Sequence, residues 1–353
     1  MRRRSATPAR RSGRRRWPLR VGVALLAVLA LGAGAWGAWW YETAWPKIAE
    51  GAPPVRLVVP PGATADTIAR QLHALGLVRH PLVFRALARA QGAGARLKAG
   101  EYALSGPLSL EGILDLLLRG DVVRRDLTIP EGRSLDEISA LVVAEGIDIE
   151  TFLEAARDPA PIRDLDPVAT DLEGYLFPDT YDVPRSPEAP RALVRRMTQR
   201  FREMIGPELG RIAERGLTVR QVVILASIVE LETARPTERP RIAAVFLNRL
   251  EKGMPLQTDP SIIYALRKAG RWDGNIRKRD FDIDSPYNTY RRAGLPPGPL
   301  GSPGRDAIRA VLEPAETREL YFVSRNDGTH EFNETLTAHN RAVNRYQRRR
   351  TTS

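Results

Sequence analysis

One segment of the sequence, residues 218–233, reads T-V-R-Q-V-V-I-L-A-S-I-V-E-L-E-T and is apolar on nearly every side. Thr218 followed three residues later by Gln221 is the pattern of a capping box, so a helix is predicted to begin here. A helix that is apolar all round is expected to be buried in the centre of a domain. The fold should therefore be built around this helix.

Two carboxylates, Glu230 and Glu232, fall in the last turn of this predicted helix. Burying a carboxylate without a partner costs several kcal/mol, so a Glu at the end of an apolar helix is expected to have a raised pKa. A general acid that works near neutral pH needs such a pKa. Residues two apart on a helix point roughly 200° apart, so the two cannot form a dyad on one face. The alternative is that one or both lie at the solvent end of the helix and merely end it.

The amino terminus combines a basic tail with an apolar stretch. Residues 1–20 hold nine Arg and no acidic residue, which leaves +3 of the net charge of +12 for the rest of the chain, so we expect no nucleic-acid surface. The charge-free stretch 21–40, flanked by Arg on one side and by a Trp cluster on the other, is long enough to span the hydrocarbon core of about 30 Å. We predict a cytoplasmic tail, a retained transmembrane anchor over residues 21–41 and an extracytoplasmic remainder; a cleaved signal peptide is the alternative.

Two segments, residues 58–77 and 127–147, repeat one pattern in the register that sets Pro60 over Pro130. Each predicts a strand, a Pro-Gly turn, an N-capped amphipathic helix and a Gly stop. Such small α/β modules resemble LysM-type glycan-binding folds, and a structural spacer without a ligand is the alternative. We therefore predict an α+β protein with a LysM-like subdomain at residues 55–125, followed by a mostly helical domain with short strands.

The carboxyl-terminal half contains short polar or Gly/Pro stretches that we expect to be loops converging on a cleft. Their Gln, Asn, Thr and Tyr side chains offer neutral hydrogen bonds suited to sugar hydroxyls and acetamido groups. Because the chain has no Cys, disulfides, thiolate metal sites and a Cys nucleophile are excluded. His330 and His339 lack ligand spacing and Ser227 lies inside the predicted helix, so neither a metal site nor a Ser-His-Asp triad is predicted. The stretches are L-Q-T-D-P (256–260), Y-N-T-Y (287–290), G-L-P-P-G (294–298), S-P-G (302–304), L-Y-F-V (320–323) and H-E-F (330–332).

These stretches, in this order after A-S-I-V-E-L-E-T and F-L-N-R-L, resemble the endolytic murein transglycosylase family, also called MltG or YceG-like. The resemblance runs from about Val55 to about Gln347 and includes E-G-Y-L-F-P-D-T-Y at residues 173–181, whose aromatics we otherwise predict to be core. It implies a membrane-anchored enzyme with a LysM-like subdomain and a catalytic domain at residues 126–347. Members cleave peptidoglycan glycan strands internally and leave 1,6-anhydro-N-acetylmuramic acid ends. No cofactor is implied.

The resemblance places the catalytic Glu in the V-E-x-E-T segment, and Glu232 followed by Thr233 also looks like the Glu-Ser pair of lysozyme-like lytic transglycosylases. Leu231 departs from the family pattern, which has Lys between the two Glu. Gln257, Asn288 and Tyr290 are expected to hold the acetamido groups and to orient the ring. The full set of expected substrate-binding residues is Glu230, Gln257, Thr258, Asp259, Tyr287, Asn288, Thr289 and Tyr290.

Two other functions stay open at this point. One is a muramidase that hydrolyses the glycan with Glu230, Glu232 or Asp259 as a second carboxylate, and the other is a non-catalytic glycan-binding scaffold of the cell-wall synthesis machinery. If neither Glu on the helix is the acid, Asp259, Glu173 and Asp179 are the next candidates. The resemblance also implies an inner-membrane location, with peptidoglycan synthases as candidate partners and termination of nascent glycan growth as a candidate role.

Overall fold

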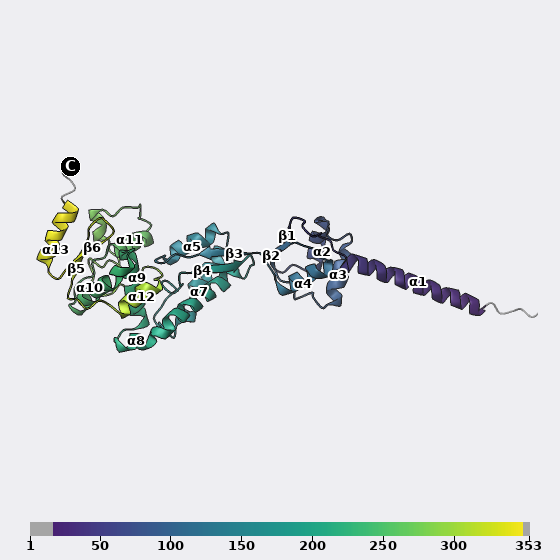
Figure 1. Cartoon of the computed structure of the whole chain (residues 1–353), viewed down its shortest axis with the longest axis horizontal. Coiled ribbons are helices and arrows are strands. Elements are labelled where there is room, and N and C mark those ends of the chain that lie inside the picture. Colours follow the sequence, from purple (N-terminus) through teal and green to yellow (C-terminus); the bar gives the residue numbers. More distant parts are fainter. Residues whose placement is uncertain (1–16, 349–353) are drawn as a thin grey trace, which may run out of the picture. The chain divides into compact units, whose positions relative to one another are not determined.

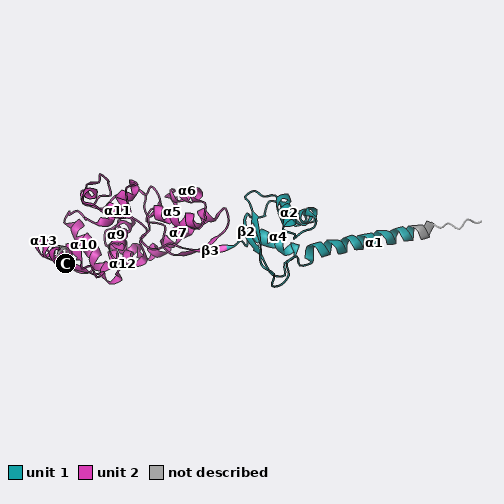
Figure 2. Ribbon diagram, turned by 90° about the horizontal axis from the view of Figure 1, so that it is seen from above, with its two compact units in different colours: residues 1–123 teal, residues 124–353 magenta. Residues whose placement is uncertain are grey.

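A computed structural model of the chain describes residues 17–348. These residues are a mixture of helices and short strands, and the chain divides into two compact units, residues 1–123 and 124–353 (Figures 1 and 2). Most of the predicted basic tail lies outside the described residues.

The first unit begins with α1 (Trp17–Ala44), a single unbroken helix of 28 residues. Its segment Val21–Ala44 has a mean hydropathy of 2.0 and is long and apolar enough, by length and composition, to cross a membrane. The helix continues past the predicted end of the anchor at residue 41, and Thr43 is buried. The last turn of α1 therefore belongs to the packed part of the unit.

The packed part of the first unit has the order strand, helix, helix, strand, helix. Its two strands pair in antiparallel fashion, with Val55 opposite Leu104, and Thr64 caps the first short helix through the backbone N–H of Thr67. The helices bury their apolar faces against the strands in one core. The elements are β1 (Val55–Val59), α2 (Ala65–Ala74), α3 (Pro81–Ala90), β2 (Gly100–Leu104) and α4 (Leu110–Arg119).

The repeat predicted from the sequence is present, and its second copy opens the second unit. Ser134 and Glu137 form a full capping box at the start of the second-copy helix. The first strand of this copy begins at Arg124, two residues before the predicted domain boundary, and pairs with a later strand with Arg124 opposite Pro184. Both copies therefore share the order strand, helix, helix, strand. The elements are β3 (Arg124–Thr128), α5 (Leu135–Ala144), α6 (Ile149–Ala156) and β4 (Thr180–Pro184).

The rest of the second unit is arranged around α9 (Val219–Glu232), as predicted. The capping box of Thr218 and Gln221 is present, and every residue from Val222 to Val229 is buried. Helices α10, α11 and α12 contact α9. The remaining helices and strands are α7 (Ala189–Ile205), α8 (Leu209–Glu214), α10 (Arg239–Glu251), α11 (Asp259–Lys268), α12 (Arg305–Leu312), β5 (Tyr321–Ser324), β6 (His330–Asn333) and α13 (Leu336–Val343). Short 3₁₀ segments are η1 (Ala160–Ile162), η2 (Gly206–Glu208), η3 (Pro236–Glu238) and η4 (Lys278–Asp282), and η5 (Asn344–Arg348) is a π-helical turn.

Two expectations about the loops have different outcomes. The aromatics of E-G-Y-L-F-P-D-T-Y are core, as predicted, because Tyr175, Phe177 and Tyr181 are all buried. The prediction that L-Y-F-V and H-E-F are loops was wrong. They form the antiparallel hairpin β5–β6, in which Phe322 lies opposite Phe332, so each strand satisfies its backbone groups through the other.

Candidate active site

The last residue of α9 opens onto a cavity of about 480 Å³ in the second unit. Its walls come from α9, α10, the segment that leads into α11, the loop that carries Tyr290, the hairpin β5–β6 and the carboxyl-terminal helical segment. Polar and charged side chains are therefore gathered from six places in the chain. The lining residues are Glu232, Arg249, Leu256, Gln257, Asp259, Tyr290, Phe322, Val323, Ser324, His330, His339, Val343 and Gln347.

The surroundings of Glu232 in this cavity shift the pKa of its carboxyl group. Loss of hydration raises the pKa of Glu232 to about 7, and the neighbouring charge of Asp259 acts in the same direction. A hydrogen bond from the Thr258 hydroxyl and the charge of Arg249 oppose this rise. A substantial fraction of Glu232 is thus protonated near neutral pH, as a general acid requires.

A buried set of hydroxyl groups holds the segment that carries Thr258. The backbone N–H of Thr258 donates to the Thr289 hydroxyl at 3.1 Å, and the Ser261 hydroxyl donates to the Thr258 carbonyl at 2.7 Å. The Ser261 and Thr289 hydroxyls lie 2.8 Å apart. Thr258, Ser261 and Thr289 are all buried and do not line the cavity. Thr258 contacts Glu232 from the protein interior, and Thr289 contacts the backbone of Thr258.

Three further predicted residues do line the cavity. Asp259 accepts a hydrogen bond of 2.6 Å from the Tyr290 hydroxyl, so a carboxylate and a phenol are paired in the same wall as Glu232. Gln257 has a φ of 51° and is exposed. This left-handed conformation is unusual outside glycine, and a hydrogen bond from its N–H to the Thr289 carbonyl at 3.1 Å stabilises it.

Asn288 and Tyr287 do not line the cavity, in contrast to what the sequence suggested. Asn288 is fully buried, its amide donates to the carbonyls of Phe281 and Ile283 at 2.9 Å each, and its side-chain oxygen accepts from the N–H of Tyr290 at 3.0 Å. Both N–H donors of the amide are thus used inside the protein and the side chain is buried, so we infer a role in shaping the loop. Tyr287 packs on Tyr264, with ring centroids 4.7 Å apart.

Glu230 lies in different surroundings from Glu232 and is absent from the lining of this cavity. One oxygen of Glu230 is paired with the buried Arg239 of α10, and the other accepts from the N–H of Gly304 at 3.0 Å. These contacts join α9 to α10 and to the start of α12. We assign Glu230 a structural role.

Arg249, in the F-L-N-R-L segment, was not among the residues predicted for the site. Its side chain is buried and donates to the carbonyls of Leu320 at 2.7 Å and Leu256 at 2.7 Å. It therefore fixes the loop before α11 relative to β5. The same guanidinium places a positive charge in the wall beside Glu232.

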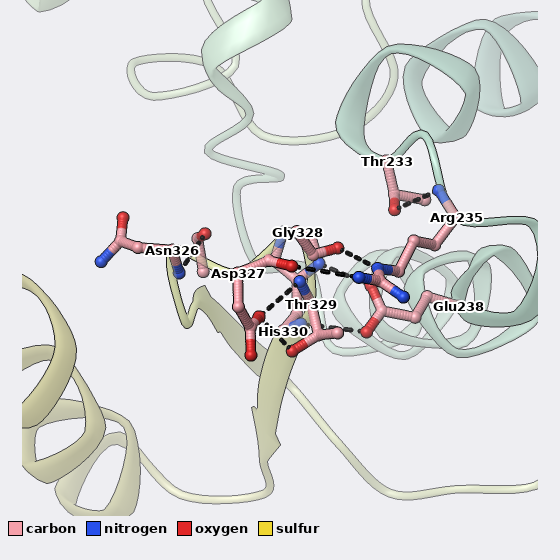
Figure 3. Close-up of polar contacts among 9 residues, drawn as sticks. Thr233, Arg235, Glu238, Asn326, Asp327, Gly328, Thr329 and His330 are labelled. Carbon is pink, nitrogen blue, oxygen red and sulfur yellow. Dashed lines mark hydrogen bonds and ion pairs between the residues drawn. The ribbon is translucent and has the colours of Figure 1, made fainter.

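The hairpin β5–β6 supplies another wall, and the segment directly after Glu232 holds its turn (Figure 3). Arg235 donates to the carbonyls of Gly328 at 2.6 Å and Asp327 at 3.0 Å. Glu238 accepts from the backbone N–H of His330 at 2.9 Å and contacts Nδ1 of its ring at 2.7 Å. His330 and His339 thus both reach the cavity, although their spacing in the sequence gave no sign of it.

Two of the other candidate acids, Glu173 and Asp179, lie elsewhere in the second unit. Burial also raises the pKa of Glu173 to about 7, but its carboxylate accepts from the N–H of Leu135 at 2.9 Å and from the Tyr264 hydroxyl at 3.2 Å. Asp179 is ion-paired with Arg200 at 2.8 Å. Neither lines the cavity of Glu232.

Comparison with known proteins agrees with this architecture. The model of the YceG-like family matches residues 57–345. An endolytic murein transglycosylase of Bacillus subtilis is 31% identical over 83% of this chain and 84% of its own length. A second, from Streptococcus pneumoniae, is 35% identical over 76% of this chain, which spans only 54% of that relative. A crystal structure of a YceG-like protein from Listeria monocytogenes matches 82% of this chain and 99% of its own, with a TM-score of 0.56 and 29% identity. The chain therefore belongs to the YceG-like family.

Proposed function

We propose that the protein is a membrane-anchored endolytic murein transglycosylase. It cleaves the β-1,4 bond from N-acetylmuramic acid to N-acetylglucosamine within glycan strands and leaves 1,6-anhydro-N-acetylmuramic acid ends. The observation that carries this proposal is Glu232, a carboxyl with a pKa of about 7 at the wall of a polar cavity. The relatives that share most of this chain and are named for this activity support it.

The proposed reaction needs one proton donor and no added water. Protonated Glu232 gives its proton to the leaving oxygen while positive charge develops at the anomeric carbon of the muramic residue. The carboxylate left behind takes the proton of the C6 hydroxyl of the same sugar, whose oxygen bonds to the anomeric carbon. Thr258 donates a hydrogen bond to Glu232 and so holds the carboxyl in place through both steps. Gln257 and the Asp259–Tyr290 pair are the proposed contacts for the acetamido and hydroxyl groups.

Digestion of purified peptidoglycan by the full chain in detergent, with products resolved by mass, tests this function. We expect anhydro products, and Glu232→Gln should lower their rate by about 10²–10⁴ because Gln cannot deliver a proton. Products heavier by one water would instead identify a muramidase, for which Asp259 in the same cavity would be the second carboxylate. Binding without any cleavage would identify a glycan-binding scaffold.

We further propose that the packed part of the first unit is a LysM-like module that binds glycan. Its strand–helix–helix–strand order and its place directly after α1 support this assignment. We propose α1 as a single-pass anchor in the inner membrane, with the amino terminus in the cytoplasm and both units outside. Peptidoglycan synthases, which work at this membrane surface, are the proposed partners, and termination of nascent strands is the proposed role.

A further inference from the structure

His330 is held in one orientation at the wall of the cavity. It is the first residue of β6, and its side chain is only 12% exposed. The rings of Phe322 and Phe332 meet it edge-on, with centroids 5.5 and 6.3 Å away. Aromatic contacts of this geometry fix the plane of the ring. The two phenylalanine rings therefore help to determine which edge of the His330 ring faces the cavity.

Glu238 determines which nitrogen of that ring is available. The carboxylate of Glu238 receives both the backbone N–H and Nδ1 of His330 (Figure 3). Burial acts to raise the pKa of Glu238, but the two hydrogen bonds from His330 outweigh it and leave the pKa lowered. An ionised carboxylate can only accept, so Nδ1 carries a proton, and Nε2 is the ring nitrogen that remains for another partner. The described residues offer Nε2 no hydrogen bond, and it is not among the polar atoms sealed from solvent.

The hairpin that carries His330 is fixed by the chain that follows the acid itself. Only two residues separate Glu232 from Arg235, which holds the hairpin turn through the carbonyls of Asp327 and Gly328. Glu238, three residues further on, holds His330. One short segment therefore positions both Glu232 and the His330 ring in the same cavity.

We propose that His330 is a substrate-contacting residue: its Nε2 forms a hydrogen bond with a hydroxyl or acetamido group of the aminosugar bound beside Glu232. Glu238 is its positioning residue. This inference rests on the proposed function, because it takes a GlcNAc–MurNAc glycan as the ligand of the cavity. The hydroxyl and acetamido groups of such a glycan offer hydrogen-bonding partners for Nε2, and Glu238 behind the ring holds that nitrogen in position.

Binding measured without turnover tests the contact directly. The full-length Glu232→Gln variant in detergent is titrated with a purified, uncross-linked GlcNAc–MurNAc oligosaccharide by calorimetry. Adding His330→Asn keeps a side-chain N–H for Glu238 but removes the atom that reaches the cavity. We expect the dissociation constant to rise about five- to tenfold, the size of one lost hydrogen bond, with an unchanged thermal midpoint.

A second variant and a control separate this role from a merely structural one. Glu238→Gln removes the carboxylate that holds the ring, so it should also weaken binding, and in the active enzyme both variants should raise KM more than they lower kcat. Thr329→Ala, which alters a turn hydrogen bond to Asp327 on the same hairpin, should leave the dissociation constant within about twofold. Unchanged affinity in both His330→Asn and Glu238→Gln would overturn the inference while the function stands. Absence of any binding by Glu232→Gln alone would contradict the proposed function itself.

Discussion

At the scale of single residues, the two glutamates at the end of α9 show how position on a helix determines chemistry. Glu232 faces a cavity and has one hydroxyl partner, whereas Glu230 is paired with Arg239 and a backbone N–H. Burial raises the pKa of both. Of the two, only Glu232 lines the cavity described above, so a raised pKa alone would not have separated them.

We expect Glu230→Gln to affect stability more than chemistry. Removing one partner of a buried ion pair leaves the charge of Arg239 without its counter-charge, and such losses reach about 3–5 kcal/mol. Since Gln keeps the hydrogen-bonding shape, a fall of about 1–3 kcal/mol in unfolding free energy is expected here. Thermal melting together with product formation at low temperature measures both effects. A folded Glu230→Gln protein without activity, beside an active Glu232→Gln protein, would exchange the two roles.

The pH dependence of cleavage should report the Glu232 carboxyl. Because only the protonated form can start the reaction, kcat/KM should fall as pH rises through about 7. The Thr258 hydroxyl stabilises the ionised form, so Thr258→Val should raise the pKa of Glu232 and shift the falling limb to higher pH. Rate profiles of the two proteins over neutral and alkaline pH provide the comparison. A limb that stays in place or moves to lower pH would show that another group controls it.

At the scale of elements, the parts that the sequence predicted well are those specified locally. A capping box at Thr218 and a continuous apolar run specify α9 without reference to the rest of the chain. The hairpin β5–β6 was missed because its stability comes from pairing between Tyr321 and Asn333 and from contacts to Arg235, nearly a hundred residues away. His330 and Arg249 were missed for the same reason, because each is held by a residue far away in the sequence: His330 by Glu238, and Arg249 by the carbonyl of Leu320.

The residue Asn288 illustrates the limit for the site itself. Its type suits a sugar ligand, and nothing in Y-N-T-Y indicates that the amide turns inward to the carbonyls of Phe281 and Ile283. The sequence therefore indicated a loop that reaches the cavity, but not which of its side chains lines it. That choice depends on backbone geometry, which only the folded chain defines.

We expect Asn288→Ala to lower the stability of this loop and, through Tyr290, the activity. It leaves two buried carbonyls and one N–H without partners, at a cost of about 2–5 kcal/mol in total. Thermal melting and the rate of glycan cleavage are the measurements. Asn275→Ala, at an exposed position nearby in the chain, is the matched control and should change neither. An Asn288→Ala protein of normal stability with weaker glycan binding would restore Asn288 as a direct ligand.

At the scale of the whole molecule, the apolar part of α1 and the packed units are separable. The segment Val21–Ala44 contains an apolar window long enough to span a membrane. None of this window is buried inside the protein. We therefore expect residues 42–353 to be soluble and folded without detergent, as gel filtration and thermal melting would show. Residues 45–353, which lack the buried Thr43, should melt at a lower temperature. Aggregation of residues 42–353 would contradict the separation.

The unbroken course of α1 into the first unit has a mechanical consequence. Trp40 still belongs to the apolar stretch, Thr43 is already part of the packed module, and at about 1.5 Å per residue less than one helical turn lies between them. With α1 in the bilayer, as proposed, no linker separates the membrane-spanning part of the helix from the packed part of the first unit. The helix and this packed module therefore move together as one rigid body. Transmembrane helices tilt by about 20° on average, and each degree of tilt would turn the module by the same angle. The thickness of the membrane would then help to aim the module at the glycan strands above it.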